Sequence, residues 1–132
     1  MRLQRIDHVV FTVRDIDKAC AFYSRALGME VVTFGAGRKA LQFGQCKINL
    51  HQHGQEFEPK AKNPAPGTQD ICLVTDTSIP EVVKHLHSLG LEIIEGPAPR
   101  TGAIGAIESV YIRDPDGNLV EIAHYLEEIG ES

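Results

Sequence analysis

An internal repeat limits the possible folds of this chain more than any other feature. Residues 27–32, Leu-Gly-Met-Glu-Val-Val, return 62 positions later at 89–94 as Leu-Gly-Leu-Glu-Ile-Ile. The same offset places an apolar stretch at 6–13, IDHVVFTV, on TQDICLVT at 68–75. A repeat of this length indicates a duplicated structural unit. We therefore expect two modules of the same fold in tandem.

Each half of the chain predicts the same order of elements. Stretches rich in β-branched and aromatic residues predict strands, and apolar residues at helical spacing predict one helix per half. Asp15 caps the first predicted helix and Gly28 ends it, whereas Pro80 begins the second and Gly90 ends it. The elements expected in the first half are 5–13, 16–27, 30–34, 39–43 and 47–53. Those expected in the second half are 69–75, 80–89, 91–95, 107–113 and 118–124, with a loop at 96–105.

These elements predict an α+β fold made of two tandem βαβββ modules within a single domain, residues 1–132. The modules span residues 1–54 and 68–125, and a linker at 55–67 with three prolines joins them. An acidic tail follows at 126–132. One helix covers only one face of a four-stranded sheet, so the other face must contact a ligand or the other module.

The repeat also pairs polar residues at matching places in the predicted strands. His8 in a first strand corresponds to Asp70, and Asn49 in a last strand corresponds to Glu121. Glu121 stands among apolar neighbours, where it lies either on a solvent-exposed face or toward a cavity as an oxygen ligand. An imidazole, two carboxylates and an amide suit a divalent cation. If the uncovered faces of the two modules pack together, the four residues converge on one metal site.

Composition argues against several other classes of function. The net charge of −5 is unfavourable for a nucleic-acid surface, and no apolar run approaches the ~20 residues that span a bilayer. The N-terminus runs directly into a strand pattern without a signal peptide, so we expect a cytoplasmic protein. The cysteines have apolar neighbours and no CxxC spacing, which predicts buried, reduced thiols. They are Cys20, Cys46 and Cys72.

Two stretches resemble the vicinal oxygen chelate superfamily, which includes glyoxalase I, bleomycin and fosfomycin resistance proteins, extradiol dioxygenases and methylmalonyl-CoA epimerase. They are IDHVVFTVRDIDKACAFYSRALGMEV and VYIRDPDGNLVEI. The middle of the chain is similar to the glyoxalase-domain-containing protein 5 type and to bacterial virulence proteins. The resemblance implies a cup-shaped sheet, a small-molecule substrate and a homodimer. It also implies a site at the dimer interface, with His8 from one chain and Asp70 with Glu121 from the other.

The resemblance further implies a divalent metal ion, which is Mn, Mg, Ni, Zn or Fe. His8 and Glu121 match metal ligands of the superfamily. Asp70 stands where a histidine is usual, and Asn49 stands where Glu or Gln is usual. The replacement of a histidine by Asp70 makes the ligand set harder, which favours Mn²⁺ or Mg²⁺. Because an amide cannot act as a general base, Asn49 also departs from the glyoxalase I pattern.

Two histidines lie near the predicted metal ligands in sequence. His51 and His53 share strand parity with Asn49, so either one is a candidate nitrogen ligand. His51 is alternatively an acid or base beside the metal, which makes it a candidate catalytic residue together with Glu121. The competing interpretation is that both histidines form a polar strand end near solvent.

Two arginines and a tyrosine are candidates for substrate binding. Arg100 lies in the predicted Gly/Pro-rich loop, which can fold over a ligand. Arg38 opens a predicted strand. Each arginine either holds a carboxylate or phosphate through its planar fork or lies on the solvated surface. Tyr111 is expected either in a pocket wall or in the core.

These observations predict a metal-dependent enzyme that acts on a small oxygen-chelating substrate. Lyase or isomerase chemistry of the lactoylglutathione-lyase-like type is the leading hypothesis, with the metal as a Lewis acid that stabilises an enolate. Three alternatives stay open. They are ligand sequestration without turnover, as in bleomycin resistance proteins, extradiol-type oxygenation, and thiol transfer of the fosfomycin-resistance type.

Overall fold

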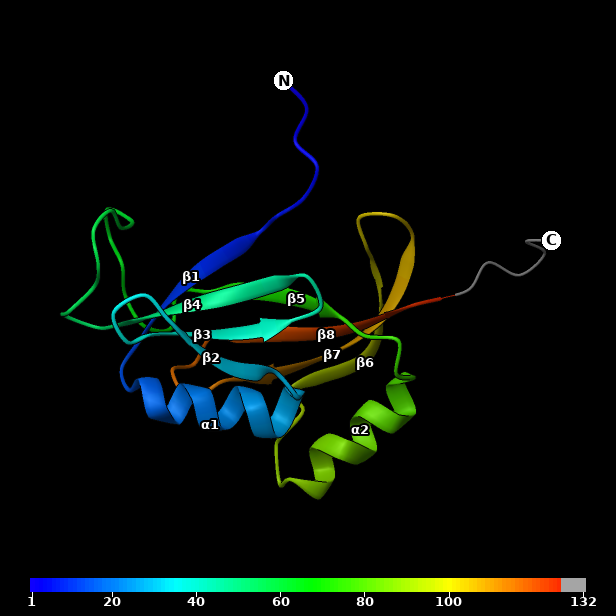
Figure 1. Cartoon of the computed structure of the whole chain (residues 1–132). Helices are drawn as coiled ribbons and strands as arrows, with labels where there is room; N and C mark the ends of the chain where they lie inside the picture. Colours follow the sequence, from blue (N-terminus) through cyan, green and yellow to red (C-terminus); the bar gives the residue numbers. More distant parts are fainter. Residues whose placement is uncertain (127–132) are drawn as a thin grey trace. The chain divides into compact units, whose positions relative to one another are not determined.

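A computed structural model describes residues 1–126 of the chain, which divide into two compact units. Unit one comprises Met1–Gln69 together with Asp114–Asn118. Unit two comprises Asp70–Arg113 and the segment that begins at Leu119. Each unit contains a four-stranded sheet and one helix in the chain order βαβββ (Figure 1). The predicted α+β fold of two tandem modules is therefore confirmed.

Unit one forms a mixed sheet with strand order β1-β4-β3-β2, in which only β1 and β4 run parallel. The helix ends follow the sequence signals. Asp15 accepts a hydrogen bond from the backbone N–H of Lys18 at 3.1 Å, and Gly28 closes the helix at φ 68°. The elements are β1 (His8–Val13), α1 (Ile16–Leu27), β2 (Glu30–Phe34), β3 (Arg38–Phe43) and β4 (Cys46–Gln52).

The core of unit one lies between α1 and one face of its sheet. α1 packs against β2, β3 and β4 (Figure 1). Because strand side chains alternate between faces, the residues of β1 and β4 that do not face α1 form a second surface. The buried core side chains are Phe11, Val13, Tyr23, Ile48 and Leu50. The opposite face carries His8, Val10, Thr12, Lys47, Asn49 and His51.

Unit two repeats this arrangement with strand order β5-β8-β7-β6. β5 and β8 run parallel, and the other pairs are antiparallel. Pro80 lies in the first turn of α2, where its missing N–H has no helical partner to lose. The elements are β5 (Asp70–Val74), α2 (Ile79–Ser88), β6 (Glu95–Thr101), β7 (Ala106–Arg113) and β8 (Leu119–Tyr125).

The predicted strand at 91–95 and the predicted loop at 96–105 are wrong. The structure instead has β6 at Glu95–Thr101, so Arg100 lies on a strand and not in a loop. Two prolines and a glycine in this stretch argue against a central strand. However, β6 is the edge of its sheet, where the missing N–H of a proline need not have a partner. The pairing of β6 with β7 also shifts register between Glu95 and Ala98.

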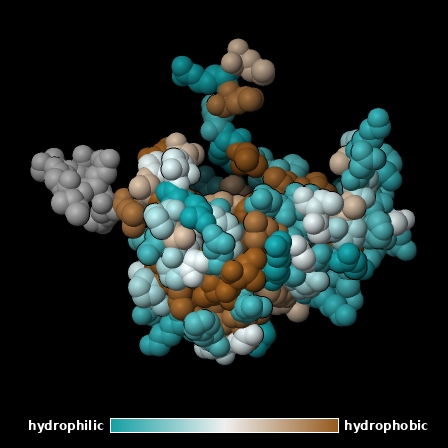
Figure 2. Space-filling view, turned by 180° about the vertical axis from the view of Figure 1, so that it is seen from behind, coloured by the Kyte–Doolittle hydropathy of each residue, from teal (hydrophilic) through white to brown (hydrophobic). Residues whose placement is uncertain are grey.

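The first strand begins three residues later than predicted, at His8 and not at Arg5. β1 pairs only with β4, and β4 begins at Cys46, so earlier residues find no ladder partner. On the face shown in Figure 2, hydrophobic side chains lie exposed among hydrophilic ones. The exposed large hydrophobic residues include Met1, Leu3, Ile6, Val74 and Ile104.

Among the described residues, neither helix is long and apolar enough to cross a membrane.

The expectation of buried cysteines is wrong for Cys72, which is exposed on β5, whereas Cys20 and Cys46 are half-buried. All three are free thiols. The predicted tail at 126–132 lies outside the described residues, except for Leu126.

Candidate functional site

The two predicted oxygen ligands Asn49 and Glu121 occupy equivalent positions in the two sheets. Asn49 on β4 lies across from Val10 of β1, and Glu121 on β8 lies across from Cys72 of β5. Val10 and Cys72 are themselves separated by the repeat offset. The partners share a face in each parallel pair, so both polar side chains belong to the face that the helix leaves uncovered.

In unit one, Asp7 contacts the ring of His8, whereas the amide oxygen of Asn49 has no hydrogen-bond partner among residues 1–126. The Nδ1 of the half-exposed His8 lies 2.9 Å from a carboxylate oxygen of Asp7, and this hydrogen bond holds the pKa of Asp7 below its ordinary value. When Nδ1 carries the proton, Nε2 of His8 keeps its lone pair, an arrangement typical of metal-binding histidines. Asn49 is 7% exposed, and its Oδ1 is buried without a hydrogen-bond partner.

In unit two, Glu121 lies beside the thiol of Cys72. Desolvation raises the pKa of Cys72 to about 11, with further contributions from the charge of Glu121 and from a hydrogen bond to it. Cys72 is therefore a protonated thiol that donates to Glu121 at neutral pH, and not a reactive thiolate. Asp70 lies at the exposed start of β5, on the same sheet face as Glu121.

The candidate substrate residues Arg100 and Tyr111 contact each other in unit two. Nε of Arg100 donates to the hydroxyl of Tyr111 at 3.0 Å, and Nη2 donates to Glu95 at 2.7 Å. The bond to Tyr111, followed by the one to Glu95, raises the pKa of Arg100. Tyr111 lies directly across from Glu121 in the β7–β8 ladder. Arg100 already has a carboxylate partner, so an anionic ligand there must compete with Glu95.

Arg38 and His51 form a second polar pair, in unit one, and the surface interpretation is wrong for His51. His51 is 3% exposed, and Arg38 is half-buried. Nη2 of Arg38 lies 3.3 Å from Nε2 of His51. Burial, and next the charge of Arg38, lower the pKa of His51. His51 is therefore neutral at neutral pH, and its Nε2 accepts a hydrogen bond from Arg38.

Two aromatic rings contact the guanidinium of Arg38. Its Cζ lies 5.1 Å from the ring centroid of Phe34 and 4.4 Å from that of Phe57. The ring of Phe57 also packs edge-on against His51, with the ring centroids 5.5 Å apart. Nε of Arg38 is buried without a hydrogen-bond partner, an arrangement that typically costs about 1–3 kcal/mol.

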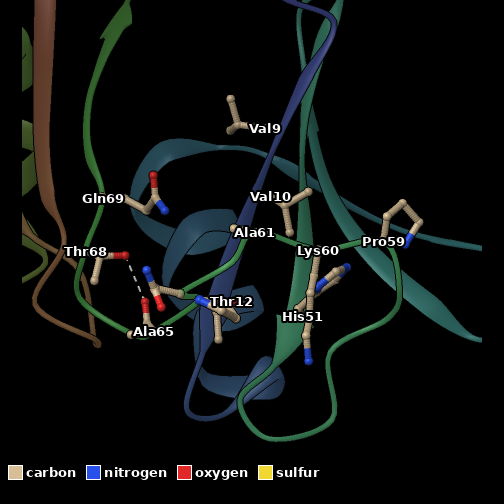
Figure 3. Close-up of a pocket in the computed structure, with 12 residues that line it drawn as sticks. Val9, Val10, Thr12, His51, Pro59, Lys60, Ala61, Ala65, Thr68 and Gln69 are labelled. Atoms are coloured by element: carbon tan, nitrogen blue, oxygen red, sulfur yellow. Dashed lines mark hydrogen bonds between the residues drawn. The ribbon is translucent and has the colours of Figure 1, made fainter.

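A cavity of about 570 Å³ lies beside His51 within unit one (Figure 3). Its volume is in the range typical of small-molecule sites, about 300–1,000 Å³. One side comes from β1 and β4 and the other from the chain between the two modules. The lining residues are Val9, Val10, Thr12, His51, Pro59, Lys60, Ala61, Asn63, Pro64, Ala65, Thr68 and Gln69.

The predicted linker therefore contributes to the candidate site, which the sequence did not indicate. Phe57 and Lys60 were missed, although Phe57 is the only aromatic residue between 54 and 67 and was an available signal. Glu56 holds this segment through the backbone N–H of Gly54 at 3.0 Å and the side chain of His53 at 3.5 Å. His53 thus lies beyond the end of β4 against the linker.

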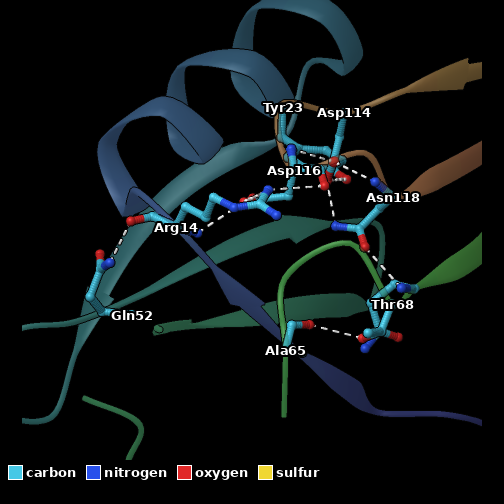
Figure 4. A network of polar contacts seen from close by, with 9 residues as sticks. Arg14, Tyr23, Gln52, Ala65, Thr68, Asp114, Asp116 and Asn118 are labelled. Carbon is cyan, nitrogen blue, oxygen red and sulfur yellow. Dashed lines mark hydrogen bonds and ion pairs between the residues drawn. The ribbon is translucent and has the colours of Figure 1, made fainter. Parts of the chain in front are cut away.

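The turn between β7 and β8, Asp114–Asn118, belongs to unit one and takes part in a buried polar network there (Figure 4). Asp114 accepts hydrogen bonds from the hydroxyl of Tyr23 at 2.7 Å and from the side-chain amide of Asn118 at 2.8 Å. Burial and the charge of Asp114 raise the pKa of Tyr23, which stays a hydrogen-bond donor. Asp116 accepts from the backbone N–H of Arg14 at 2.9 Å. These carboxylates already have partners, so we interpret the network as structural.

The predicted metal ligands are chemically suited to a divalent cation. The Oδ1 of Asn49, which has no hydrogen-bond partner among the described residues, fits such an ion, as do the imidazole of His8 and the carboxylates of Asp70 and Glu121. Unit one supplies two of these residues and unit two supplies the other two. Within residues 1–126, no three His, Cys, Asp or Glu side chains lie close enough together to hold a metal ion. The four-residue site is therefore a proposal.

Comparison with known proteins agrees with this fold. A family model described as the Glyoxalase/Bleomycin resistance protein/Dioxygenase superfamily matches residues 5–122. The chain belongs to this superfamily. Virulence protein STM3117 of Salmonella typhimurium is 55% identical over 126 residues, which cover 96% of this chain and 88% of that protein. Its crystal structure gives a TM-score of 0.94 over 96% of this chain and 100% of that chain.

Two further proteins are similar to this chain in sequence. Glyoxalase domain-containing protein RDO1 of Mycosarcoma maydis is 55% identical over 125 residues, or 95% of this chain and 70% of that protein. The mitochondrial methylmalonyl-CoA epimerase of Homo sapiens is 31% identical over 136 residues, or 91% of this chain and 73% of that protein.

Proposed function

We propose that this superfamily member is a metal-dependent enzyme that stabilises an anion formed from a small substrate in a lyase or isomerase reaction. The observation that carries the proposal is the buried Oδ1 of Asn49, which has no hydrogen-bond partner within residues 1–126 and stands at the position equivalent to Glu121. A buried oxygen without a donor is unfavourable unless a ligand or cation occupies its lone pairs. The likeness to an epimerase supports the isomerase direction.

In this proposal, His8 and Asn49 of one chain hold the metal together with Asp70 and Glu121 of a second chain in a homodimer. Divalent cations with an oxygen-rich ligand set act as Lewis acids toward a substrate carbonyl, and such a set favours Mn²⁺ or Mg²⁺. The remaining roles belong to side chains of the protein. Asp7 orients the ring of His8 through their hydrogen bond.

Tyr111 is the proposed donor to negative charge that develops on the substrate. Its hydroxyl accepts a hydrogen bond from Arg100, which leaves its own proton free to donate, and the residue lies across from Glu121. Cys72 lies across from Glu121 in the β5–β8 pair and keeps its proton at neutral pH. His51 has its Nε2 occupied by Arg38. We therefore propose that His51 positions Arg38 and does not itself remove a proton.

Metal titration of matched variants tests this function. We expect the purified protein to bind Mn²⁺ or Mg²⁺ and Glu121→Gln to weaken that affinity at least about 10-fold, since it removes a charged ligand. Glu92→Gln is the control, because Glu92 is an exposed carboxylate elsewhere in unit two. If the protein binds no divalent metal, or if both variants bind it equally, the proposed enzyme is excluded.

The cavity in unit one favours a second candidate, a protein that binds a small molecule without turnover. The cavity is built from unit one alone and does not require Asp70 or Glu121. A ligand that binds to metal-free protein, without any metal-dependent conversion over a panel of 2-oxo acids and thiohemiacetals, would favour this candidate over the enzyme.

A further inference from the structure

Arg38 is a cation without an anionic partner. Within the part of the chain that the structure describes, no Asp or Glu forms an ion pair with it. One of its five N–H donors points to His51, and its Nε has no acceptor. A guanidinium is always charged, and a half-buried charge normally has a partner. The missing partner indicates a site for a ligand with an oxyanion.

The neighbours of Arg38 stabilise its charge but do not use up its donors. The rings of Phe34 and Phe57 attract the cation, yet they offer no lone pair in the plane of the guanidinium. His51 takes up a single N–H of Arg38. The in-plane edge of Arg38 thus keeps the geometry that matches the two coplanar oxygens of a carboxylate.

Other charges near this position leave a local positive excess in an acidic chain of net charge −5. Nζ of Lys47 lies 4.0 Å from the ring centroid of Phe34, so a second cation borders the same ring. Lys60 adds less, because it already lies 3.8 Å from a carboxylate oxygen of Glu56 and 3.4 Å from one of Glu58. Arg38 and Lys47 therefore carry most of the attraction for an anion, and of these two only Arg38 has a planar fork.

The cavity beside His51 supplies room for an uncharged part of the same ligand. Much of its lining is apolar, with Val10 from β1 and Pro59 and Ala61 from the linker (Figure 3). We propose that Arg38 binds the carboxylate of a small carboxylic acid whose apolar body occupies this cavity. The inference deepens the proposed function by naming a substrate class for the face that carries Asn49, but the binding itself requires no metal.

Binding of matched probes to protein treated with a chelator tests the proposal. The probes are hydrocinnamate, its methyl ester and phenethylphosphonate, which share one apolar body and differ in the head group. We expect hydrocinnamate to raise the melting temperature of the protein, and we expect titration calorimetry to detect its binding. The affinity should fall at high salt. The ester should bind at least about 10-fold more weakly, because it lacks the charge that Arg38 recognises. Equal binding of acid and ester, or tighter binding of the phosphonate, overturns the proposal.

Two variants on the same strand, each lacking one positive charge, distinguish binding at Arg38 from a general effect of positive charge. Arg38→Met should weaken hydrocinnamate binding about 10- to 100-fold, the range expected for a lost charge-assisted pair. Lys39→Met, the control, removes a cation from the next position of β3, where the side chain bonds Thr33 on the other face. The affinity of Lys39→Met for hydrocinnamate should stay within about twofold of that of the wild type. Equal loss in both variants overturns the proposal.

Arg38→Lys provides a check that does not depend on the tolerance of the fold for methionine. It keeps the charge but lacks the planar fork, so hydrocinnamate affinity should fall between those of wild type and Arg38→Met. Unchanged affinity in both Arg38 variants overturns the proposal. The metal titration of Glu121→Gln tests the metal site separately, so a failed carboxylate site and a failed metal site give different results.

Discussion

The two equivalent strand positions of the repeat carry different chemistry, an amide at Asn49 and a carboxylate at Glu121. Asn49 lies in β4, which pairs with β1, and Glu121 lies in β8, which pairs with β5. Only Glu121 can ionise, so the charge proposed for metal binding belongs to unit two. The amide contributes an oxygen without adding a buried charge, which is compatible with its 7% exposure.

Asn49→Asp should make the stability of the protein depend on metal. Without metal, a second carboxylate at this buried position should lower the free energy of unfolding by about 1–3 kcal/mol. Added Mn²⁺ should raise the melting temperature of the variant more than that of the wild type, because the new charge strengthens the ligand set. Thermal melts with and without Mn²⁺ measure both effects. An identical metal response in the two proteins would contradict the placement of Asn49 at the cation.

Tyr23→Phe should destabilise the folded protein without touching the candidate site. The hydroxyl of Tyr23 donates to the buried Asp114, and a hydrogen bond to a charged group contributes about 1.5–3 kcal/mol. Urea unfolding should show a loss of that size. In the control, Tyr125→Phe removes a hydroxyl that accepts from the backbone of Ile104 at an exposed position, where we expect less than about 1 kcal/mol. Equal losses would argue against a special role for Asp114.

At the scale of elements, the linker between the modules contributes more to the candidate site than the strand pattern suggested. Strand parity was predictable from His8 and Asn49 because alternation is a local property. The end of α1 at Gly28 was also local, since the helix stops where a left-handed residue closes it. The contact of Phe57 with Arg38 was not predictable, because it depends on the path of a segment without periodicity.

The edge strand β6 shows a second limit of sequence patterns. Pro97 and Pro99 predicted a loop, since a proline cannot donate within a ladder. However, β6 lies at the edge of its sheet, where a proline need not donate a hydrogen bond. Whether a strand lies at an edge depends on the whole sheet and cannot be read from the local sequence. Arg100 consequently lies on a strand and pairs with Glu95. The metal-ligand prediction has a different status, because it needs residues from both units and stays a prediction.

Glu56 should make the stability of the linker depend on pH. The backbone N–H of Gly54 is the main cause of its lowered pKa, with Lys60 and His53 adding smaller attractions. Since the pKa is lower in the folded state, the charged carboxylate stabilises the fold at neutral pH. This contribution disappears as the pH falls below the ordinary value of 4.5 and through the folded value.

Glu56→Gln should therefore melt below the wild type at neutral pH, and the difference should shrink as the pH falls. Melting temperatures of both proteins across an acidic pH series measure this. Glu58→Gln is a suitable control, because its exposed carboxylate receives no backbone hydrogen bond in the part of the chain described here. A difference that stays constant from neutral to acidic pH would contradict the role of the Glu56 charge.

At the scale of the whole molecule, duplication divides the proposed metal ligands equally between two units. Neither unit alone contains the full set. Subunit mixing tests the proposed sharing between chains. His8→Ala and Glu121→Gln each remove one ligand, and each variant alone should bind metal poorly. A heterodimer of the two variants brings together an intact unit one from one chain and an intact unit two from the other.

Equal mixing of the two variants, after unfolding and refolding together, should therefore restore about a quarter of the wild-type metal sites if two chains form each site in a twofold dimer. Metal binding measured against the unmixed variants quantifies the recovery. No recovery, with dimer exchange confirmed by differently tagged chains, would show that each chain uses its own ligands.

The wall of the unit-one cavity comes largely from a segment that belongs to no strand ladder. Residues such as Pro59, Lys60 and Ala61 can change in kind without altering the backbone pairing of any strand. A few substitutions in this short segment can thus change which ligand the cavity accepts. The side chains of the folding core stay the same.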